Sequence, residues 1–248
     1  LLSPSPIEAI ALSSYIDVIH QDSRDEPGMV ARLRELVAGR AERSAVVIGN
    51  RDSTAQFLIA HRDELEPEYV VPFPSAEAMN ALSDKVAFAE ACAEQGLRTP
   101  RQVVVDCSEL ADGDPQIDIP FPLVGKAAVG ADWDAVEFPG QRKIYFIDTP
   151  EELASLWSDL RSAGYQSTFL IQERIPGEDD AMRSVTAYMA SNGEMTMIGS
   201  ARVLLEDHTP TLIGNPVAMI TEPFPELWEG AEKLLTSVGY RGFANFDV

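Results

Sequence analysis

Two lysines occupy positions where a phosphate-binding site would need them. Of the 19 basic residues among 248, only four are lysine. Lys85 opens a helical segment two residues after Ser83, the expected N-cap, so its ammonium can join first-turn amides that face an anion. Lys126 ends the apolar run FPLVGK, where an ammonium without an anionic partner is costly to bury. The alternatives are a surface lysine on an acidic helix and a lysine reaching outward from a strand end.

Three further side chains could take part in the same chemistry. Asp247, in the strand-like GFANFDV, alternates with Asn245 and offers the carboxylate oxygen that Mg²⁺ prefers. Arg202 carries a planar fork that suits a terminal phosphate or a substrate carboxylate, and Arg183 is a weaker candidate. Ion pairs with the abundant acids are the alternative for both arginines. The three histidines are scattered without ligand spacing, so zinc is not expected.

The elements that must position these residues change in character near Phe73. Before it, strands at 15–19, 45–50 and 68–73 alternate with helices at 27–38 and 52–65, the pattern of a parallel sheet with crossover helices. Beyond it, strand-like runs precede Lys126 and Asp247, a capped helix starts at Thr149, and Asn192-Gly193 indicates a hairpin. We expect an α/β parallel-sheet unit followed by α+β lobes.

Composition excludes several classes of function. The net charge of −21 argues against nucleic acid, whose backbone would be repelled. No apolar run reaches the roughly 18 residues of a membrane helix, and no signal peptide is visible. Cys92 and Cys107 form neither a CxxC pair nor a metal spacing, which favours reduced thiols and the cytoplasm. Local cations and a divalent metal would have to overcome the negative field to hold an anion such as ATP.

The order of Lys85, Lys126, Glu173 and Asp247 resembles the ATP-grasp superfamily, in particular the carboxylate–amine ligases related to biotin carboxylase, carbamoyl-phosphate synthetase and D-aspartate ligase. The resemblance implies that Lys85 contacts ATP phosphates and that Lys126 contacts the α-phosphate and the adenine edge. It implies a magnesium ligand at Asp247, whose usual partners, a later Glu and Asn, are absent from the sequence. Adenine and ribose contacts are implied for the segment IQERIPGEDD, at Gln172, Glu173, Arg174, Ile175, Glu178 and Asp180.

The same resemblance implies a domain organisation and an activity. Residues 1–72 would form part of a pre-ATP-grasp domain, and residues 73–248 an ATP-grasp domain with a small lobe at about 115–172. A loop at 130–142 would cover the phosphates, and 50–53 would serve the substrate side. The chain, which starts at Leu1, is expected to be truncated at both ends.

The expected activity is ATP- and Mg²⁺-dependent ligation of a carboxylate, an amino acid among the candidates, to an amine through an acyl phosphate, with Arg202 as a catalytic residue. The expected partners are therefore small molecules, and we allow for a homodimer. The alternatives are bicarbonate phosphorylation and a non-catalytic nucleotide-binding protein.

Overall fold

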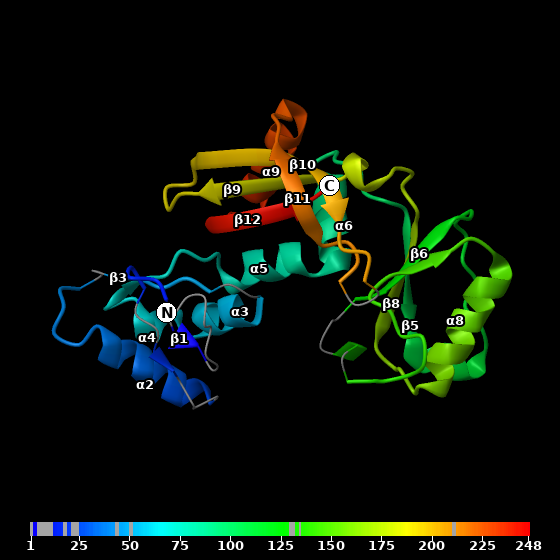
Figure 1. Cartoon of the computed structure of the whole chain (residues 1–248), viewed down its shortest axis with the longest axis horizontal. Coiled ribbons are helices and arrows are strands. Elements are labelled where there is room, and N and C mark those ends of the chain that lie inside the picture. The colour runs from blue at the N-terminus through cyan, green and yellow to red at the C-terminus, as the bar shows by residue number, and fades with distance from the viewer. Residues whose placement is uncertain are drawn as a thin grey trace. The chain divides into compact units, whose positions relative to one another are not determined.

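The computed structural model of the chain divides into two units, Leu1–Ala76 and Glu77–Val248 (Figure 1). It describes residues 2–3, 12–16, 19–20, 25–42, 45–49, 52–128, 132–133, 135–209 and 212–248. Within these residues, no helix combines the length and the apolar character needed to cross a membrane. The fold is mixed α/β, with parallel strand pairs in the first unit and antiparallel sheets in the second.

In its described residues, the first unit contains short parallel strand pairs and the helices α2, α3 and α4. Strand β1 (Leu2–Ser3) pairs with β2 (Ile19–His20), and β3 (Ala45–Val46) pairs with β4 (Tyr69–Val70). Helix α2 (Glu26–Leu36) is capped by Asp25, whose carboxylate accepts from the Gly28 amide. The helix predicted at 52–65 is two helices, α3 (Asp52–Ala60) and α4 (Arg62–Leu65). Residues of α2, α3, α4 and β4 contribute to one hydrophobic core, which comprises Val30, Leu33, Val37, Leu58, Leu65, Tyr69 and Val71.

His61, at the break between α3 and α4, lies between two carboxylates. Its Nδ1 is 2.7 Å from Glu64 Oε1 and its Nε2 is 3.4 Å from Glu26 Oε2, and its ring lies 4.8 Å from that of Phe57. The hydrogen bond with Glu64 raises the pKa of His61 above its ordinary value, against the opposing effect of burial. The protonated imidazole therefore ties the start of α2 to α4.

This arrangement predicts a pH-dependent stability. A histidine whose pKa is raised on folding stabilises the protein below the pKa of the unfolded state, and the contribution is lost as the pH rises through the folded pKa. Urea unfolding should show wild type more stable than His61→Gln at about pH 5.5, with the difference shrinking by about pH 8. Glu64→Gln should remove most of this pH dependence. A difference that is constant with pH would contradict the role of His61.

The second unit contains a four-stranded antiparallel sheet covered by one long helix. Strands β5 (Gln102–Asp106), β6 (Leu123–Ala127), β7 (Tyr145–Ile147) and β8 (Thr168–Glu173) lie in the order β5-β8-β6-β7, and η1 (Cys107–Asp112) follows β5. Helix α8 (Pro150–Ser162) begins at the predicted cap Thr149, which forms a capping box with Glu152. Its buried residues Leu153, Leu156, Trp157 and Leu160 pack with the sheet in one core.

The alternation of side chains along β6 decides which face of the sheet Lys126 lies on. Leu123 belongs to the core under α8, and successive residues of a strand point to opposite faces. Residues directly opposite one another on paired strands point to the same face. Gly125 shares the core face, where a Cβ would lie only 2.9 Å from Phe169 Cε1. Lys126, paired with Leu170, is therefore on the other face, together with Gln172. The glycine lets β6 approach the core closely while the next residue faces away from it.

A second antiparallel sheet has the order β11-β10-β9-β12. Strands β9 (Arg183–Met189) and β10 (Met195–Glu206) form the hairpin predicted from Asn192-Gly193, with Gly193 at φ +91°. Strands β11 (Pro216–Thr221) and β12 (Gly242–Asp247) flank them, and η2 (Asp179–Ala181) precedes β9. Figure 1 shows β9, β10 and β12 side by side. Helix α9 (Pro225–Ser237) packs its Leu235 with Ala187 and Met189 of β9.

Two consecutive helices lead into the second unit. Helix α5 (Ala76–Ser83) was not predicted from the sequence, and neither was strand β11. Helix α6 (Lys85–Glu94) follows directly, and Gly96 at φ +70° comes just after its end as predicted. The predicted cap of α6 was wrong, since Ser83 ends α5 and Asp84 caps α6.

Candidate functional site

Lys85 is the first residue of α6, and its ammonium reaches the end of β6. Its Nζ donates to the carbonyl oxygens of Ala127 (3.2 Å) and Ala128 (2.7 Å). The cap Asp84 accepts from the amides of Val86 (2.9 Å) and Ala87 (2.8 Å), so these first-turn amides do not face a free anion as the sequence suggested. Lys85 therefore acts through its ammonium, at the end of β6 in the sheet β5-β8-β6-β7.

Lys126 is the most deeply placed cation of the site. Burial lowers the pKa of its ammonium, and the neighbouring charges of Lys85 and Lys143 lower it further. Among the described residues, none accepts a hydrogen bond from Lys126 or forms an ion pair with it. A half-buried ammonium without a counter-charge is costly unless an anion arrives to share the site.

Lys143 is a third cation that sequence reasoning missed. Its Nζ donates to Asn215 Oδ1 at 2.8 Å, and its charge lowers the pKa of Lys85, after burial and against the opposing effect of Asp84. The charges of Lys85 and Lys143 act on Lys126, and that of Lys143 acts on Lys85, so we call these three of the four lysines the lysine cluster. The scarcity of lysine could have identified Lys143, because it makes each lysine of the sequence worth considering. The fourth lysine, Lys233, lies on α9 and contacts only Gln95 O at 3.5 Å within the described chain.

Asp247 is the last residue of β12, and the charge of Lys143 affects its carboxyl. Burial raises the pKa of its carboxyl, while Lys143 and a hydrogen bond with Ser184 oppose the rise. It pairs with Ser184 across β12 and β9, on the same face as Asn245. Within the described ranges, no three His, Cys, Asp or Glu side chains gather into a ready metal site. Asp247 thus offers a single carboxylate, the kind of oxygen ligand that a magnesium ion prefers.

The segment from Gln172 to Ile175 is less open than predicted. Gln172 Nε2 donates to Gln102 Oε1 at 2.8 Å, on the face that carries Lys126. The carboxylate of Glu173 is held by Arg101, with Oε1 accepting from the backbone amide (3.0 Å) and Oε2 from Nε (2.8 Å), which lowers its pKa. The Glu173 carboxylate is therefore occupied by a protein partner.

The backbone of this segment is also engaged. The Glu173 amide donates to Arg101 O at 2.9 Å and the Arg174 amide to Pro122 O at 3.1 Å, so both backbone donors already have a protein partner. The Arg174 guanidinium lies over the Phe146 ring at 4.7 Å, and the side chain of Ile175 is 60% exposed. An exposed apolar side chain and a polar sheet face remain at this strand end.

The acids after the Pro176-Gly177 turn divide into one structural residue and two open ones. Asp179 accepts from the Glu206 amide (3.0 Å) and lies 3.1 Å from His208 Nε2. Glu178 precedes η2 without a side-chain capping bond, and Asp180 contributes its backbone carbonyl to Arg183. Considering the described residues alone, the carboxylates of Glu178 and Asp180 make no hydrogen bond.

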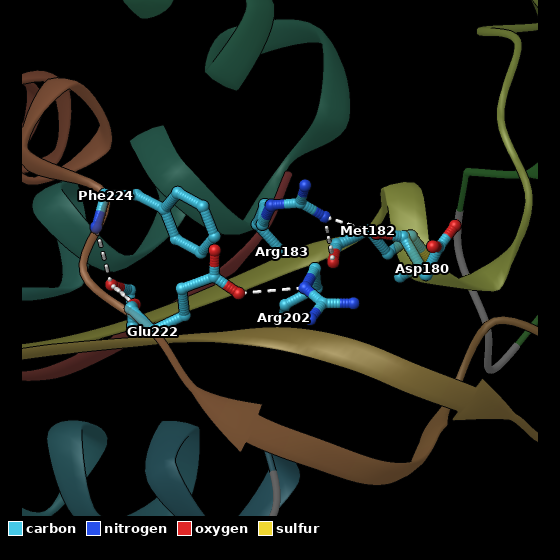
Figure 2. A network of polar contacts seen from close by, with 7 residues as sticks. Asp180, Met182, Arg183, Arg202, Glu222 and Phe224 are labelled. Carbon is cyan, nitrogen blue, oxygen red and sulfur yellow. Dashed lines mark hydrogen bonds and ion pairs between the residues drawn. The ribbon is translucent and has the colours of Figure 1, made fainter.

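Arg202, the predicted catalytic residue, is bound to a carboxylate on the α9 side of its sheet. Its Nε donates to Glu222 Oε2 at 2.8 Å (Figure 2). It pairs directly with Arg183, whereas Asp247 pairs with Ser184, so alternation places Arg202 and Asp247 on opposite faces. The structure therefore gives Arg202 the ion pair that was its alternative reading and does not bring it to Asp247.

The neighbouring Arg183 is held mainly by backbone and an aromatic ring. Its Nη1 donates to the carbonyls of Asp180 (2.6 Å) and Met182 (3.0 Å), and its guanidinium lies 4.8 Å above the Phe224 ring (Figure 2). Ser200 Oγ accepts from the Phe224 amide at 3.2 Å and donates to Glu222 O at 2.6 Å. This network anchors the chain that enters α9.

Two predicted loops fall partly outside the described residues. Residues 129–131 and 134, in or beside the loop expected over the phosphates, are among them, as are 50 and 51 of the expected substrate-side loop. In the described part of the first loop, Gln141 Nε2 donates to Trp133 O at 3.0 Å and the Arg142 amide to Tyr145 Oη at 3.0 Å.

Comparison with known proteins adds one sequence relative and several structural neighbours. No family model matches the chain. D-aspartate ligase from Enterococcus faecium (strain Aus0004) is 31% identical over 205 residues, which is 82% of this chain and 49% of that protein. The chain therefore spans about half the length of the curated relative it matches.

Three solved structures share the fold at low sequence identity. Biotin carboxylase from Campylobacter jejuni has a TM-score of 0.61 at 18% identity, over 94% of this chain and 52% of its own. PurK, an N5-carboxyaminoimidazole ribonucleotide synthetase in complex with ADP, has a TM-score of 0.64 at 13% identity, over 99% and 58%. L-amino acid ligase from Bacillus licheniformis has a TM-score of 0.59 at 13% identity, over 93% and 51%.

Proposed function

Because this chain is a homologue of D-aspartate ligase with the fold of ATP-grasp enzymes, we propose that it forms the nucleotide-binding part of an ATP-dependent carboxylate–amine ligase. The observation that carries the proposal is the lysine cluster. Three of four lysines meet in a chain of net charge −21, and no described carboxylate forms an ion pair with any of them. A polyanion such as a triphosphate supplies the missing counter-charge.

We assign the phosphates to the lysine cluster and the base to the neighbouring sheet face. Lys85 and Lys126 meet at the end of β6, where Lys85 is fixed by two carbonyl oxygens. The same face carries Gln172 and the half-exposed ring of Phe146, which pairs with Val124. An amide beside apolar surface suits a purine ring, which needs both stacking and hydrogen bonds. Glu178 and Asp180 stay candidates for the ribose hydroxyls.

Asp247 is the proposed carboxylate ligand of magnesium. When bound, such an ion would supply positive charge that stabilises the phosphates during transfer. Asp247 would hold this ion, and the charge of Lys143 affects the same carboxyl. Glu173 is not assigned to the nucleotide through its side chain, because Arg101 already holds it.

The proposed reaction needs no side-chain nucleophile. A substrate carboxylate oxygen attacks the terminal phosphorus, the bond to the bridging oxygen breaks, and ADP leaves with the electron pair. The amine then attacks the acyl carbon, phosphate leaves, and the ammonium proton passes to solvent. The lysines hold the phosphates in line and stabilise their charge, which is how proteins accelerate phosphoryl transfer. Arg202 has no step in this scheme.

The substrates proposed are an amino acid and a second carboxylate or amine, since the sequence relative is named a D-aspartate ligase and one structural neighbour an L-amino acid ligase. We propose Glu77–Val248 as the nucleotide-binding domain and Leu1–Ala76 as the domain that precedes it. The small lobe would then include β5 as well as the predicted 115–172, because β5 belongs to the same sheet. The homodimer and the cytoplasmic location stay predictions from the sequence.

Two measurements test the proposal. Calorimetric titration should show ATP binding that requires Mg²⁺, and ATP-dependent phosphate release should rise when one member of a panel of D- and L-amino acids is added. Phosphate release that depends on bicarbonate alone would favour a different ATP-grasp reaction. Absence of ATP binding at millimolar nucleotide would refute the function.

A further inference from the structure

Two glutamine side chains lie next to one another on the sheet face that carries Lys126. Gln102 of β5 and Gln172 of β8 are directly opposite one another, and residues in that relation share a face. Gln172 also pairs with Val124 of β6, and Lys126 follows two residues later on the same face. The two side-chain amides therefore belong to the surface proposed for the nucleotide.

The amide of Gln102 is held in one of its two orientations. Its Nε2 donates to the backbone carbonyl of Lys85, the first residue of α6, at 3.4 Å. A carbonyl oxygen accepts hydrogen bonds and cannot donate them, so the NH₂ group of Gln102 must face α6 and its Oε1 must face away. Lys85 is itself held at the end of β6, because its Nζ donates to two carbonyl oxygens there. The orientation of Gln102 thus rests on a fixed acceptor.

The orientation of Gln102 in turn sets that of Gln172. Gln172 Nε2 donates to Gln102 Oε1 at 2.8 Å, and turning the Gln172 amide over would bring two oxygens together. The Oε1 of Gln172 is left over, and in the described chain it accepts no hydrogen bond. Of the enclosed side-chain nitrogen and oxygen atoms in the described residues, only Glu68 Oε2 lacks a hydrogen bond. The unpaired Oε1 of Gln172 is therefore open to an incoming group.

An oxygen that can only accept discriminates between purine bases. The amino group at position 6 of adenine supplies the donor that Gln172 Oε1 needs. The oxo group at position 6 of hypoxanthine or guanine would place a second acceptor against this oxygen and leave both unpaired, which costs binding free energy. The neighbouring carboxylate of Glu173 does not take part, because Arg101 already holds it.

The surroundings of the two glutamines can receive a flat ring. Val104 follows Gln102 on the same face of β5 and is 45% exposed. Phe146 of β7 lies in the same row across the sheet as Gln172 and Val124, and it is 44% exposed. Exposed apolar side chains that flank an oriented amide suit a heterocyclic base, which needs apolar contact and a few placed polar groups.

We propose that Gln172 selects a 6-aminopurine nucleotide over a 6-oxopurine nucleotide by accepting a hydrogen bond from the 6-amino group. Gln102 is the positioning residue, because its contact with Lys85 O keeps the Gln172 amide from turning over. The proposal rests on the proposed function, since it needs a nucleotide whose base lies on this face. Gln102 does not touch the base in this scheme and acts only through Gln172.

The test compares Mg²⁺–ATP with Mg²⁺–ITP, whose base carries an oxo group at position 6 in place of the amino group. Calorimetry would measure both affinities for wild type and for each variant. We expect wild type to bind ATP about tenfold more tightly than ITP, the discrimination that one good contact between an amide and a base supplies. Gln172→Leu should weaken ATP binding about tenfold and ITP binding less than about twofold, so that the ratio of affinities falls to about one.

Variants of Gln102 separate positioning from packing. Gln102→Leu leaves the Gln172 amide able to turn over and donate to a 6-oxo group, so the preference for ATP should fall about fivefold. A carboxylate can still accept from Gln172, so Gln102→Glu should keep the preference, although its added charge weakens both nucleotides alike. If Gln102 only supported the packing of the sheet, neither variant would change the ratio of the two affinities.

Gln166→Leu is the matched control, because Gln166 is an exposed glutamine between α8 and β8, and both affinities should match wild type in this variant. Equal binding of the two nucleotides by wild type, or an unchanged ratio in Gln172→Leu, would overturn the proposal while leaving the proposed function standing. Wild type that binds neither nucleotide would overturn both. If Gln172→Leu does not fold, as judged by circular dichroism, Gln102→Leu decides alone, and an unchanged ratio in that variant rejects the roles of both glutamines.

Discussion

Lys126→Met should weaken ATP binding about 100-fold, equivalent to roughly 3 kcal/mol, and at the same time make the nucleotide-free chain more stable. The loss follows from the removal of a half-buried cation that the described chain leaves without a partner. The gain, on the order of 1 kcal/mol, follows because methionine has a similar volume and no charge to desolvate. Calorimetry with Mg²⁺–ATP and urea unfolding would measure the two effects on the same sample.

If Lys126→Met weakens ATP binding and raises the free energy of unfolding, Lys126 serves ligand recognition and reduces the stability of the fold. Lys233→Met is the matched control, since Lys233 is on α9 and makes only a 3.5 Å contact with Gln95 O in the described residues. Both quantities should stay near wild type in this variant. A Lys126→Met protein that binds ATP normally would remove Lys126 from the site.

Phe169→Ala should destabilise the second unit by about 3–5 kcal/mol, the usual effect of deleting a fully buried aromatic ring. Phe169 is 0% exposed, and four aromatic rings surround it with centroids 5.8 to 6.3 Å away, namely Trp133, Tyr145, Trp157 and Tyr165. Because Phe169 lies on β8 directly opposite Ala127, the residue after Lys126, the same variant should weaken nucleotide binding when the sheet opens.

Phe146→Ala is the matched control for the effect of Phe169→Ala on stability. Phe146 is on β7 of the same sheet but on the opposite face, and it is 44% exposed. Its removal should cost no more than about 1 kcal/mol, mostly from the lost contact with Arg174. Denaturant unfolding followed by tryptophan fluorescence would measure both variants. Similar destabilisation by the two substitutions would contradict the placement of the core on the α8 face.

Local patterns in the sequence were enough to predict several elements of the fold. The hairpin at Asn192-Gly193 and the capped start of α8 at Thr149 were predicted correctly because each depends on neighbours a few residues apart. The cap of α6 was misplaced by one residue, since Ser83 and Asp84 are both good caps and only the preceding helix α5 decides between them. Strand β11 was missed because it pairs at the edge of a sheet already formed by β9 and β10.

The site depended on contacts that no local pattern records. Lys143 meets Asn215 across 72 residues, and Glu173 meets Arg101 across the same separation. Arg202 was a reasonable candidate by type, but its partner Glu222 and its face of the sheet follow from strand register. The scarcity of lysine drew attention to Lys85 and Lys126. The same criterion, applied to all four lysines, would have made Lys143 a candidate as well.

The concentration of lysines at one place also determines how the protein can be handled chemically. Reagents that acylate primary amines find three of their four lysine targets in the lysine cluster, so conjugation through amines would neutralise the proposed nucleotide site. The two native thiols offer no alternative, because Cys92 and Cys107 are both buried. Fluorophores and surface tethers therefore belong on a newly introduced exposed cysteine, well away from the sheet β5-β8-β6-β7.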